Sequence, residues 1–241
     1  MYLSVIIPAY NEEKNIEKTI RSVFGYLKDK NIEHEIIVVT DGSEDKTNEI
    51  VRTMLSSVPT LQLIDNPRNM GKGYVVRQGM LKAKGEYRLF TDADNATSVD
   101  HIEKMIPYLK DGGYGVAIGS IGLKEAKVAS GSEPVWRLVF GKMGNFFIQA
   151  MVVPGIHDTQ RGFKILTARA AEDIFSRMRI NRWGFDIEML GLARKLGYKI
   201  KEVAVNWKND PNSHVSFKAY FQVLVETIKI KWNLITGKYN K

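Results

Sequence analysis

The sequence contains no cysteine and no apolar run long enough to cross a membrane, and each absence excludes a class of protein. Without cysteine there is no disulfide framework, thiol nucleophile or thiolate metal site, so we expect an intracellular protein. The longest apolar run, residues 146–156, is broken by Gln149, Pro154 and Gly155, and it is shorter than the roughly 20 residues of a spanning helix. A strand expected from Leu3 leaves no room for a signal peptide. We therefore expect a soluble protein or one bound peripherally to a membrane.

Two glycine-rich nucleotide-binding motifs are also missing. Gly71-Lys72-Gly73 does not have the GxxxxGK[ST] spacing of a Walker loop, and no GxGxxG motif follows the first expected strand. The second absence argues against a dinucleotide-dependent dehydrogenase.

The chain does have length, apolar content and positive charge. Its 241 residues are 44% apolar, enough to bury the core of one domain or at most two small ones. The formal net charge of +8 is compatible with a lysine-rich solvated surface, with a polyanionic substrate or anionic membrane, or with nucleic acid. Composition alone does not choose among these three.

The first half of the chain alternates short apolar runs with helical patterns. Strands are expected at 3–7, 35–39, 61–64, 87–91 and 116–120, and helices around 11–27, 47–55 and 71–81. Asn11 is expected to cap the first helix. Near-continuous apolar strands separated by helices predict an α/β fold of Rossmann-like type, with a mostly parallel sheet covered on both faces.

The second half is less regular. Residues 123–134 are rich in Gly, Ser and Lys and are expected to form a loop. Beyond them we expect helices over 135–151, 168–177, 186–196 and 217–232, the last of them amphipathic, and a strand at 200–207. No repeat or linker divides the chain, so we expect one domain over residues 1–241.

Two carboxylates, Asp92 and Asp94, follow the expected strand 87–91. Ligands of parallel sheets bind beyond the carboxyl ends of the strands, and residues two apart project to the same side. Such a pair is unfavourable unless a cation lies between the charges. Mg²⁺ takes one or two protein carboxylates and completes its shell with substrate phosphates and water. The alternative is two solvated aspartates, but their position favours a divalent-metal site formed by Asp92 and Asp94.

Two further groups lie at strand ends. Asp41 can accept hydrogen bonds from a base or from ribose hydroxyls, or it can cap a helix in a turn. Gly71-Lys72-Gly73 allows close backbone approach at a helix N-terminus, which favours an anion, and Lys72 adds a positive charge. The alternative for this segment is an ordinary loop.

The sequence resembles the family 2 glycosyltransferases, which have the GT-A fold. It is most similar to the branch that makes polyprenyl-phosphate sugars, the dolichyl-phosphate glucosyl- and mannosyltransferases. The motifs that carry the resemblance run in family order over nearly the whole chain: SVIIPAYNEE (4–13), VVTDGSEDKT (38–47), NMGKGYVVRQG (69–79), DAD (92–94), DTQRGFK (158–164), RWGFDIE (182–188) and VAVNW (203–207). The last three motifs point to the glucosyltransferase side.

The resemblance implies roles for individual residues. Pro8, Tyr10 and Glu12 would lie against the nucleotide, and Asp41 would bind its base, uracil in the case of UDP. Asp92 and Asp94 would meet a Mg²⁺ or Mn²⁺ ion and the diphosphate. Arg137, with Asn145, matches an arginine near the acceptor phosphate.

Four positions depart from the family pattern. Thr40, Ile121 and Gly141 replace an aspartate, an arginine and a serine of the family motifs. Arg161 stands where the family has Cys or Ser, and we hypothesise that it partly replaces the cation missing at 121. These departures concern the acceptor more than the donor.

The expected reaction is an inverting transfer of a sugar from a nucleotide-sugar donor. A metal held by Asp92 and Asp94 would stabilise the leaving diphosphate, and Lys72 would do so as well. A phosphate acceptor already carries about −1.5 to −2 charge, so it needs no general base, and Arg137, Arg161 and Lys164 would position it. For a hydroxyl acceptor, Asp158 or Asp186 could be the base, although a structural role is favoured for both.

We therefore expect a metal-dependent transferase that moves glucose from UDP-glucose to a polyprenyl phosphate at the cytoplasmic face of a membrane. Residues 1–120 would bind the nucleotide sugar, and residues 121–241 would bind the acceptor and touch the membrane through the helix with Phe146 and the last helix. The alternatives are a GDP-mannose donor or a glycan hydroxyl acceptor. A nucleic-acid-binding protein is disfavoured because clustered acids repel phosphate, and a homo-oligomer stays open.

Overall fold

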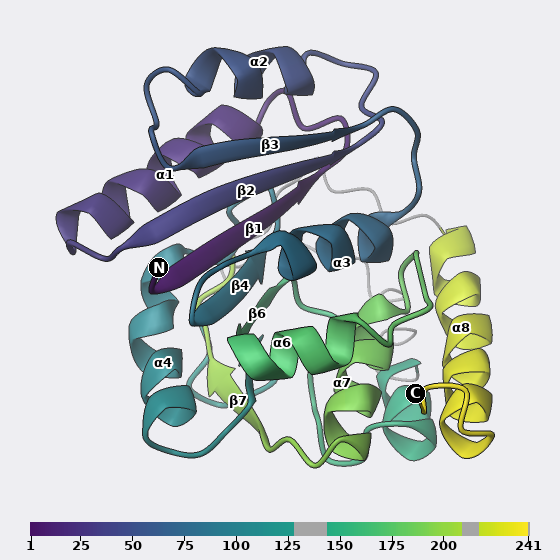
Figure 1. The fold of residues 1–241 in the computed structure, drawn as a ribbon. Helices are drawn as coiled ribbons and strands as arrows, with labels where there is room; N and C mark the ends of the chain where they lie inside the picture. Colours follow the sequence, from purple (N-terminus) through teal and green to yellow (C-terminus); the bar gives the residue numbers. More distant parts are fainter. Residues whose placement is uncertain (128–143, 209–216, 241) are drawn as a thin grey trace.

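The computed structural model describes residues 1–127, 144–208 and 217–240. A seven-stranded sheet in the order β3-β2-β1-β4-β6-β5-β7 runs through the molecule, with helices on both faces (Figure 1). The strands are β1 Leu3–Ala9, β2 His34–Asp41, β3 Leu61–Asn66, β4 Tyr87–Thr91, β5 Val116–Ser120, β6 Phe163–Thr167 and β7 Ile200–Ala204. The main helices are α1 Ile16–Asp29, α2 Thr47–Met54, α3 Lys72–Lys82, α4 Ile102–Lys110, α6 Ala168–Phe175, α7 Phe185–Lys195 and α8 Phe217–Ile235.

Two apolar cores sandwich the sheet because strand side chains alternate between its faces. Ile6 of β1 joins a core with α3, α6 and α7, whereas its neighbours Val5 and Ile7 join a second core with α1, α2 and α4. Both faces are buried, as the continuous apolar strands predicted.

The predicted strands and helices of the described residues are confirmed, but three elements were missed. Strand β6 lies antiparallel between β4 and β5, so the sheet is mixed rather than wholly parallel. Its sequence, FKILT, contains the charged Lys164, which interrupts the apolar pattern. Helix α4 and the short 3₁₀ turn Val99–His101 before it were also missed.

Asn11 does not cap α1, so this prediction is wrong. The helix begins at Ile16, after the N-cap residue Asn15. Asn11 has a positive φ of 55°, and its side-chain oxygen accepts a hydrogen bond from the Glu44 backbone N–H at 2.9 Å. It therefore joins the loop after β1 to the loop after β2.

The C-terminal part packs beside α7. Helix α8 lies against α7 at the edge of the molecule (Figure 1). Residues 144–151 are helical, as expected. The first part of the predicted helix, 135–143, lies within the segment 128–143 that the structure does not describe. Within the described residues, no helix combines the length and hydropathy needed to cross a membrane.

Candidate active site

A cleft of about 1170 Å³ opens at the carboxyl ends of β1, β2 and β4. We call it the large cleft. Its walls contain all the residues predicted for the donor side: Pro8, Tyr10, Glu12, Asp41, Lys72, Asp92 and Asp94. Parallel strands bring these residues together because their carboxyl ends share one edge of the sheet.

The loops after β1 and β2 are locked to each other. Glu12 N–H donates to Thr47 Oγ1 at 2.8 Å, and Glu13 N–H donates to Asp45 Oδ2 at 3.0 Å. Tyr10 is 45% exposed and lines the cleft. Since the backbone beneath it is fixed by these bonds, Tyr10 presents its ring to the cleft in a defined place.

Asp41 lines the large cleft but is only 3% exposed. Its two carboxylate oxygens accept the backbone N–H groups of Met70 and Gly71, at 2.6 and 2.9 Å. Burial raises the pKa of Asp41, against these hydrogen bonds and the attraction of Arg182. Asp41 thus holds the loop that leads into α3, and its contact with a base stays a prediction.

The glycine at position 71 lets a third segment approach the cleft. Gly71 has φ 102°, and a Cβ there would collide with the carbonyl oxygen of Asn181. The next residues, Arg182 and Trp183, line the large cleft and were not predicted as site residues. Their segment is fixed by Glu188, whose carboxylate accepts the Ile180 N–H at 2.8 Å.

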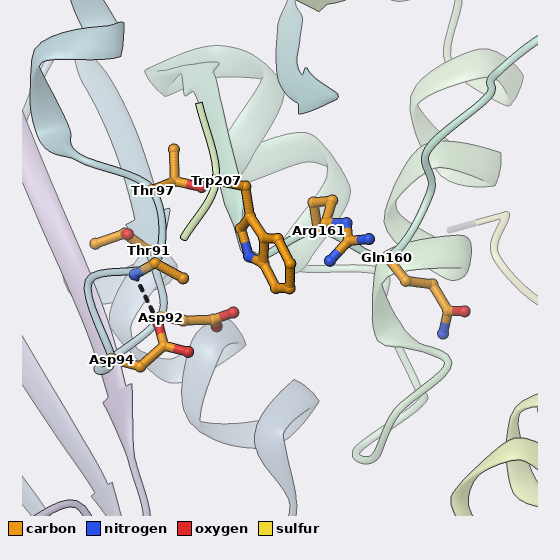
Figure 2. Close-up of a pocket in the computed structure, with 9 residues that line it drawn as sticks. Thr91, Asp92, Asp94, Thr97, Gln160, Arg161 and Trp207 are labelled. Carbon is orange, nitrogen blue, oxygen red and sulfur yellow. Dashed lines mark hydrogen bonds between the residues drawn. The ribbon is translucent and has the colours of Figure 1, made fainter. Parts of the chain in front are cut away.

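The acid pair is positioned by strand β4 and by the turn before β6. Asp92 N–H donates to the Gly162 carbonyl at 3.1 Å, and a Cβ at position 162 would occupy the space of the Asp92 carboxylate. Asp94 Oδ1 accepts the Ala96 N–H at 2.9 Å, the dashed bond of Figure 2. Glycine at 162 is therefore required for the present position of Asp92.

These residues fit a hard divalent cation. The described part of the chain contains no cluster of three or more His, Cys, Asp or Glu side chains arranged for a metal. Asp92 and Asp94 nevertheless line the same wall, and Gly162 leaves room for the first carboxylate. A pair of carboxylates suits Mg²⁺ or Mn²⁺, which take their remaining ligands from substrate oxygens and water.

Lys164 does not line the large cleft. Its side chain is 0% exposed, its ammonium is 2.6 Å from Asp186 Oδ1, and it also donates to the carbonyl of Arg161. The prediction that Lys164 positions the acceptor by contact is therefore wrong for this structure. Burial raises the pKa of Asp186, while the ammonium groups of Lys164 and Lys72 oppose the rise. The structural role favoured for Asp186 fits this buried pair.

A second, small pocket of about 120 Å³ adjoins the acid pair. Figure 2 shows Trp207 between the two aspartates and Arg161. The guanidinium of Arg161 lies 4.8 Å from the centroid of the Trp207 ring, and its Nε is 3.3 Å from Asp158 Oδ2. Asp158 also accepts the Ile121 N–H at 3.0 Å, so Arg161 does lie near the position of the missing family arginine.

Arg137 and Gly141 lie outside the described residues. Asn145, their partner in the expected pattern, donates to the His157 carbonyl at 2.6 Å. Three aromatic residues of the two pockets, Trp183, Trp207 and Tyr220, were not predicted to line them. The two tryptophans belong to motifs that carry the family resemblance, but the tertiary structure is what brings them to the site.

The chain is similar to known proteins over most of its length. A family model described as "Glycosyl transferase family 2" matches residues 4–175. A dolichyl-phosphate beta-glucosyltransferase of Trichomonas vaginalis is 36% identical, with 95% of this chain and 73% of that protein covered. The Mus musculus protein of that name is also 36% identical, with 98% of this chain and 77% of that protein covered.

Solved structures resemble the fold. Glucosyl-3-phosphoglycerate synthase of Mycobacterium tuberculosis, crystallised with Mn²⁺, UDP and glucosyl-3-phosphoglycerate, matches with a TM-score of 0.71 at 17% identity and covers 97% of this chain and 79% of its own. S. aureus TarS 1-349 matches with a TM-score of 0.61 at 18% identity and covers 97% and 72%. These likenesses support the GT-A fold. With its mostly parallel sheet, its acidic cleft and the family match over 4–175, the chain belongs to glycosyl transferase family 2.

Proposed function

We propose that the protein transfers glucose from UDP-glucose to a polyprenyl phosphate of the dolichyl type, at a membrane surface and with inversion at the anomeric carbon. The observation that carries this proposal is the pair of adjoining pockets that share Asp92 and Asp94. The large cleft would take the donor, and the small pocket with Arg161 would take the acceptor phosphate. The names of the relatives, dolichyl-phosphate beta-glucosyltransferases, support glucose and the lipid phosphate.

On the donor side, Pro8, Tyr10 and Glu12 would contact the nucleotide, with Asp41 fixing the loop beneath it. Asp92 and Asp94 would hold a Mg²⁺ or Mn²⁺ ion, which when bound supplies electrostatic stabilisation of the diphosphate. Lys72 opens α3 and can donate to the same phosphate oxygens at the N-terminus of that helix. Negative charge that grows on the leaving group therefore meets fixed positive groups of this chain.

On the acceptor side, Arg161 is the cation available to a phosphate. Its guanidinium is held in place by Asp158 and Trp207, so little ordering is needed when an anion binds. Arg137 would add a second charge from the segment outside the described residues. A phosphate monoester brings its own negative charge, so the attack requires no general base, in agreement with the ion pairs of Asp158 and Asp186.

Helix α8 supports contact with a lipid surface. A stripe of apolar side chains at helical spacing is exposed on it, from 50% at Val225 to 69% at Ile235, and we call this the α8 stripe: Phe221, Val225, Ile228, Trp232 and Ile235. On the same helix, Ala219, Tyr220 and Val223 line the large cleft. A membrane against the α8 stripe would therefore lie on the far side of a helix that lines the large cleft, which adjoins the small pocket.

The division of labour follows from these contacts. We propose that residues 1–120 supply the donor site and the acid pair, whereas 121–241 supply the acceptor pocket and the membrane contact. Arg182 and Trp183 would be the part of the second half that reaches the donor.

A panel of nucleotide sugars tests the function. We expect the purified protein with Mn²⁺ to transfer glucose from UDP-glucose to a short polyprenyl phosphate, and to leave GDP-mannose and glycan acceptors nearly untouched. Product formation would be followed by mass spectrometry of the lipid. Preferred use of GDP-mannose would contradict the donor assignment, and transfer to a glycan hydroxyl in place of the lipid phosphate would contradict the acceptor assignment.

A further inference from the structure

Lys72 and Asp92 form an ion pair in the wall of the large cleft. The distance from Lys72 Nζ to Asp92 Oδ1 is 2.5 Å, and the lysine side chain is 26% exposed. This ammonium thus lies beside one of the two carboxylates that fit a divalent cation. The single positive charge of Lys72 therefore already neutralises the negative charge of Asp92.

A second ion pair lies behind the first. Lys164 and Asp186, 2.6 Å apart and almost wholly buried, are close enough for Asp186 to attract Lys72. An ammonium 2.5 Å from one carboxylate and near a second keeps its positive charge at neutral pH. Lys72 is therefore held as a cation in the position that the structure records.

We propose that Lys72 is the internal counter-ion of Asp92 and that it exchanges between this carboxylate and the donor diphosphate, so that the divalent cation and the nucleotide bind interdependently. The inference rests on the proposed function for the nature of the donor. While Lys72 pairs with Asp92, the ammonium competes with a doubly charged ion for that carboxylate. When a diphosphate attracts Lys72, Asp92 becomes available to the ion.

The position of Lys72 in the chain permits this exchange. It is the first residue of α3, after Gly71, where backbone N–H groups favour an anion. A flexible four-carbon stem lets its ammonium turn from the carboxylate toward phosphate oxygens nearby. Lys164 cannot do the same, because its side chain has no exposed surface and its ammonium is held by Asp186 and the Arg161 carbonyl.

The exchange predicts how metal affinity depends on the nucleotide. In the wild-type protein, Mn²⁺ alone must compete with the ammonium for Asp92, so its affinity should be low and should rise when UDP is added. Without the ammonium, Mn²⁺ alone should bind more tightly, and the gain caused by UDP should shrink to what its phosphate oxygens contribute as metal ligands. The part of the coupling beyond this direct ligation is therefore a property of one side chain, and it is reciprocal.

The test is a titration of Mn²⁺ followed by electron paramagnetic resonance of the free ion, with and without UDP. For Lys72→Met we expect Mn²⁺ alone to bind about tenfold tighter than to wild type, and the gain caused by UDP to fall by about the same factor. Lys72→Arg keeps the charge and should behave as wild type does. Lys82→Met, an exposed lysine at the other end of α3, is the matched control for the change in net charge and should have no effect.

Mn²⁺ affinity of Lys72→Met equal to or weaker than that of wild type, without UDP, would overturn the proposal. If Lys72→Met does not fold, Lys72→Gln serves the same purpose with a polar side chain. No sugar and no acceptor are present in these titrations. Their failure would therefore leave glucose transfer intact, and failure to transfer glucose would leave the Mn²⁺ result standing.

Discussion

The large cleft and the small pocket share the acid pair but are held together by different interactions. Around the large cleft, loops that follow buried parallel strands are joined by bonds from backbone N–H groups to side-chain acceptors, such as those from Met70 and Gly71 to Asp41. Around the small pocket, side chains hold side chains, as Asp158 and Trp207 hold Arg161. A bond from a backbone N–H depends on one side chain only, whereas a contact between two side chains is lost when either of them is replaced. Of the four departures that the resemblance implies, Arg161 lines the small pocket and Ile121 lies beside it, bonded to Asp158.

The largest effect is expected where the two pockets meet. Asp94→Asn keeps the shape and the oxygen that accepts the Ala96 N–H, but removes the charge of a metal ligand. We expect turnover to fall by about 10³-fold, with the thermal unfolding midpoint unchanged. Asp111→Asn, the same change at an exposed position after α4, is the control. Turnover at the wild-type rate in Asp94→Asn would contradict the role of the acid pair.

A smaller effect is expected from Gly162→Ala, which alters the position of Asp92 and not its charge. The added Cβ would occupy the space of the carboxylate, which must then move away from the acid pair. Misplacement of such a group by about 1 Å costs about 10²-fold in turnover. Gly25→Ala, in α1 with no atom within 4 Å of the added carbon, is the matched control. Equal turnover of the two variants would show that Asp92 tolerates displacement.

The large cleft was predictable because its residues follow strands that the sequence marks clearly. Asp92 and Asp94 lie directly after β4, and Lys72 opens α3, so knowing the strand ends was enough. The hydrogen-bond partners of each side chain were not predictable. The Asp41 oxygens accept N–H groups from residues 70 and 71, about 30 positions away, and that depends on how the loop folds back.

The small pocket was harder to predict because it depends on β6. Lys164 appears in the sequence as a charged residue near an acceptor motif, yet β6 lies between β4 and β5 and carries this side chain into the core. Trp207 is brought to the pocket by long-range bonds, such as the one from Lys208 N–H to the Ala96 carbonyl at 2.9 Å, across more than 100 residues of chain. No local pattern contains that information.

A substitution of Trp207 tests the small pocket separately from the large cleft. Trp207→Ala removes the ring that lies against the Arg161 guanidinium, an interaction of about 0.5–2 kcal/mol, so the KM of the lipid phosphate should rise about tenfold. The KM of UDP-glucose should stay constant, since Trp207 does not line the large cleft. Trp207→Phe keeps an aromatic face and should restore most of the affinity for the acceptor. Equal losses for donor and acceptor would mean that Trp207 only supports the fold.

The smallest effect on chemistry is expected from the α8 stripe, which faces away from both pockets. Ile228→Ser combined with Trp232→Ser removes two apolar side chains that are 54% and 60% exposed, so the unfolding midpoint should hardly change. Binding to vesicles that contain anionic lipid should weaken about tenfold, because interfacial affinity follows the apolar area that enters the membrane.

The substrate decides whether this loss matters. Turnover with a short, water-soluble polyprenyl phosphate should equal that of wild type, whereas turnover with a long-chain acceptor in vesicles should fall with the binding. Leu55→Ser replaces an exposed apolar residue after α2 with a polar one, away from α8. This control should change neither the binding to vesicles nor the turnover. If the double variant bound vesicles as well as wild type, the lipid would have to reach Arg161 from another side, and the contact proposed for α8 would be wrong.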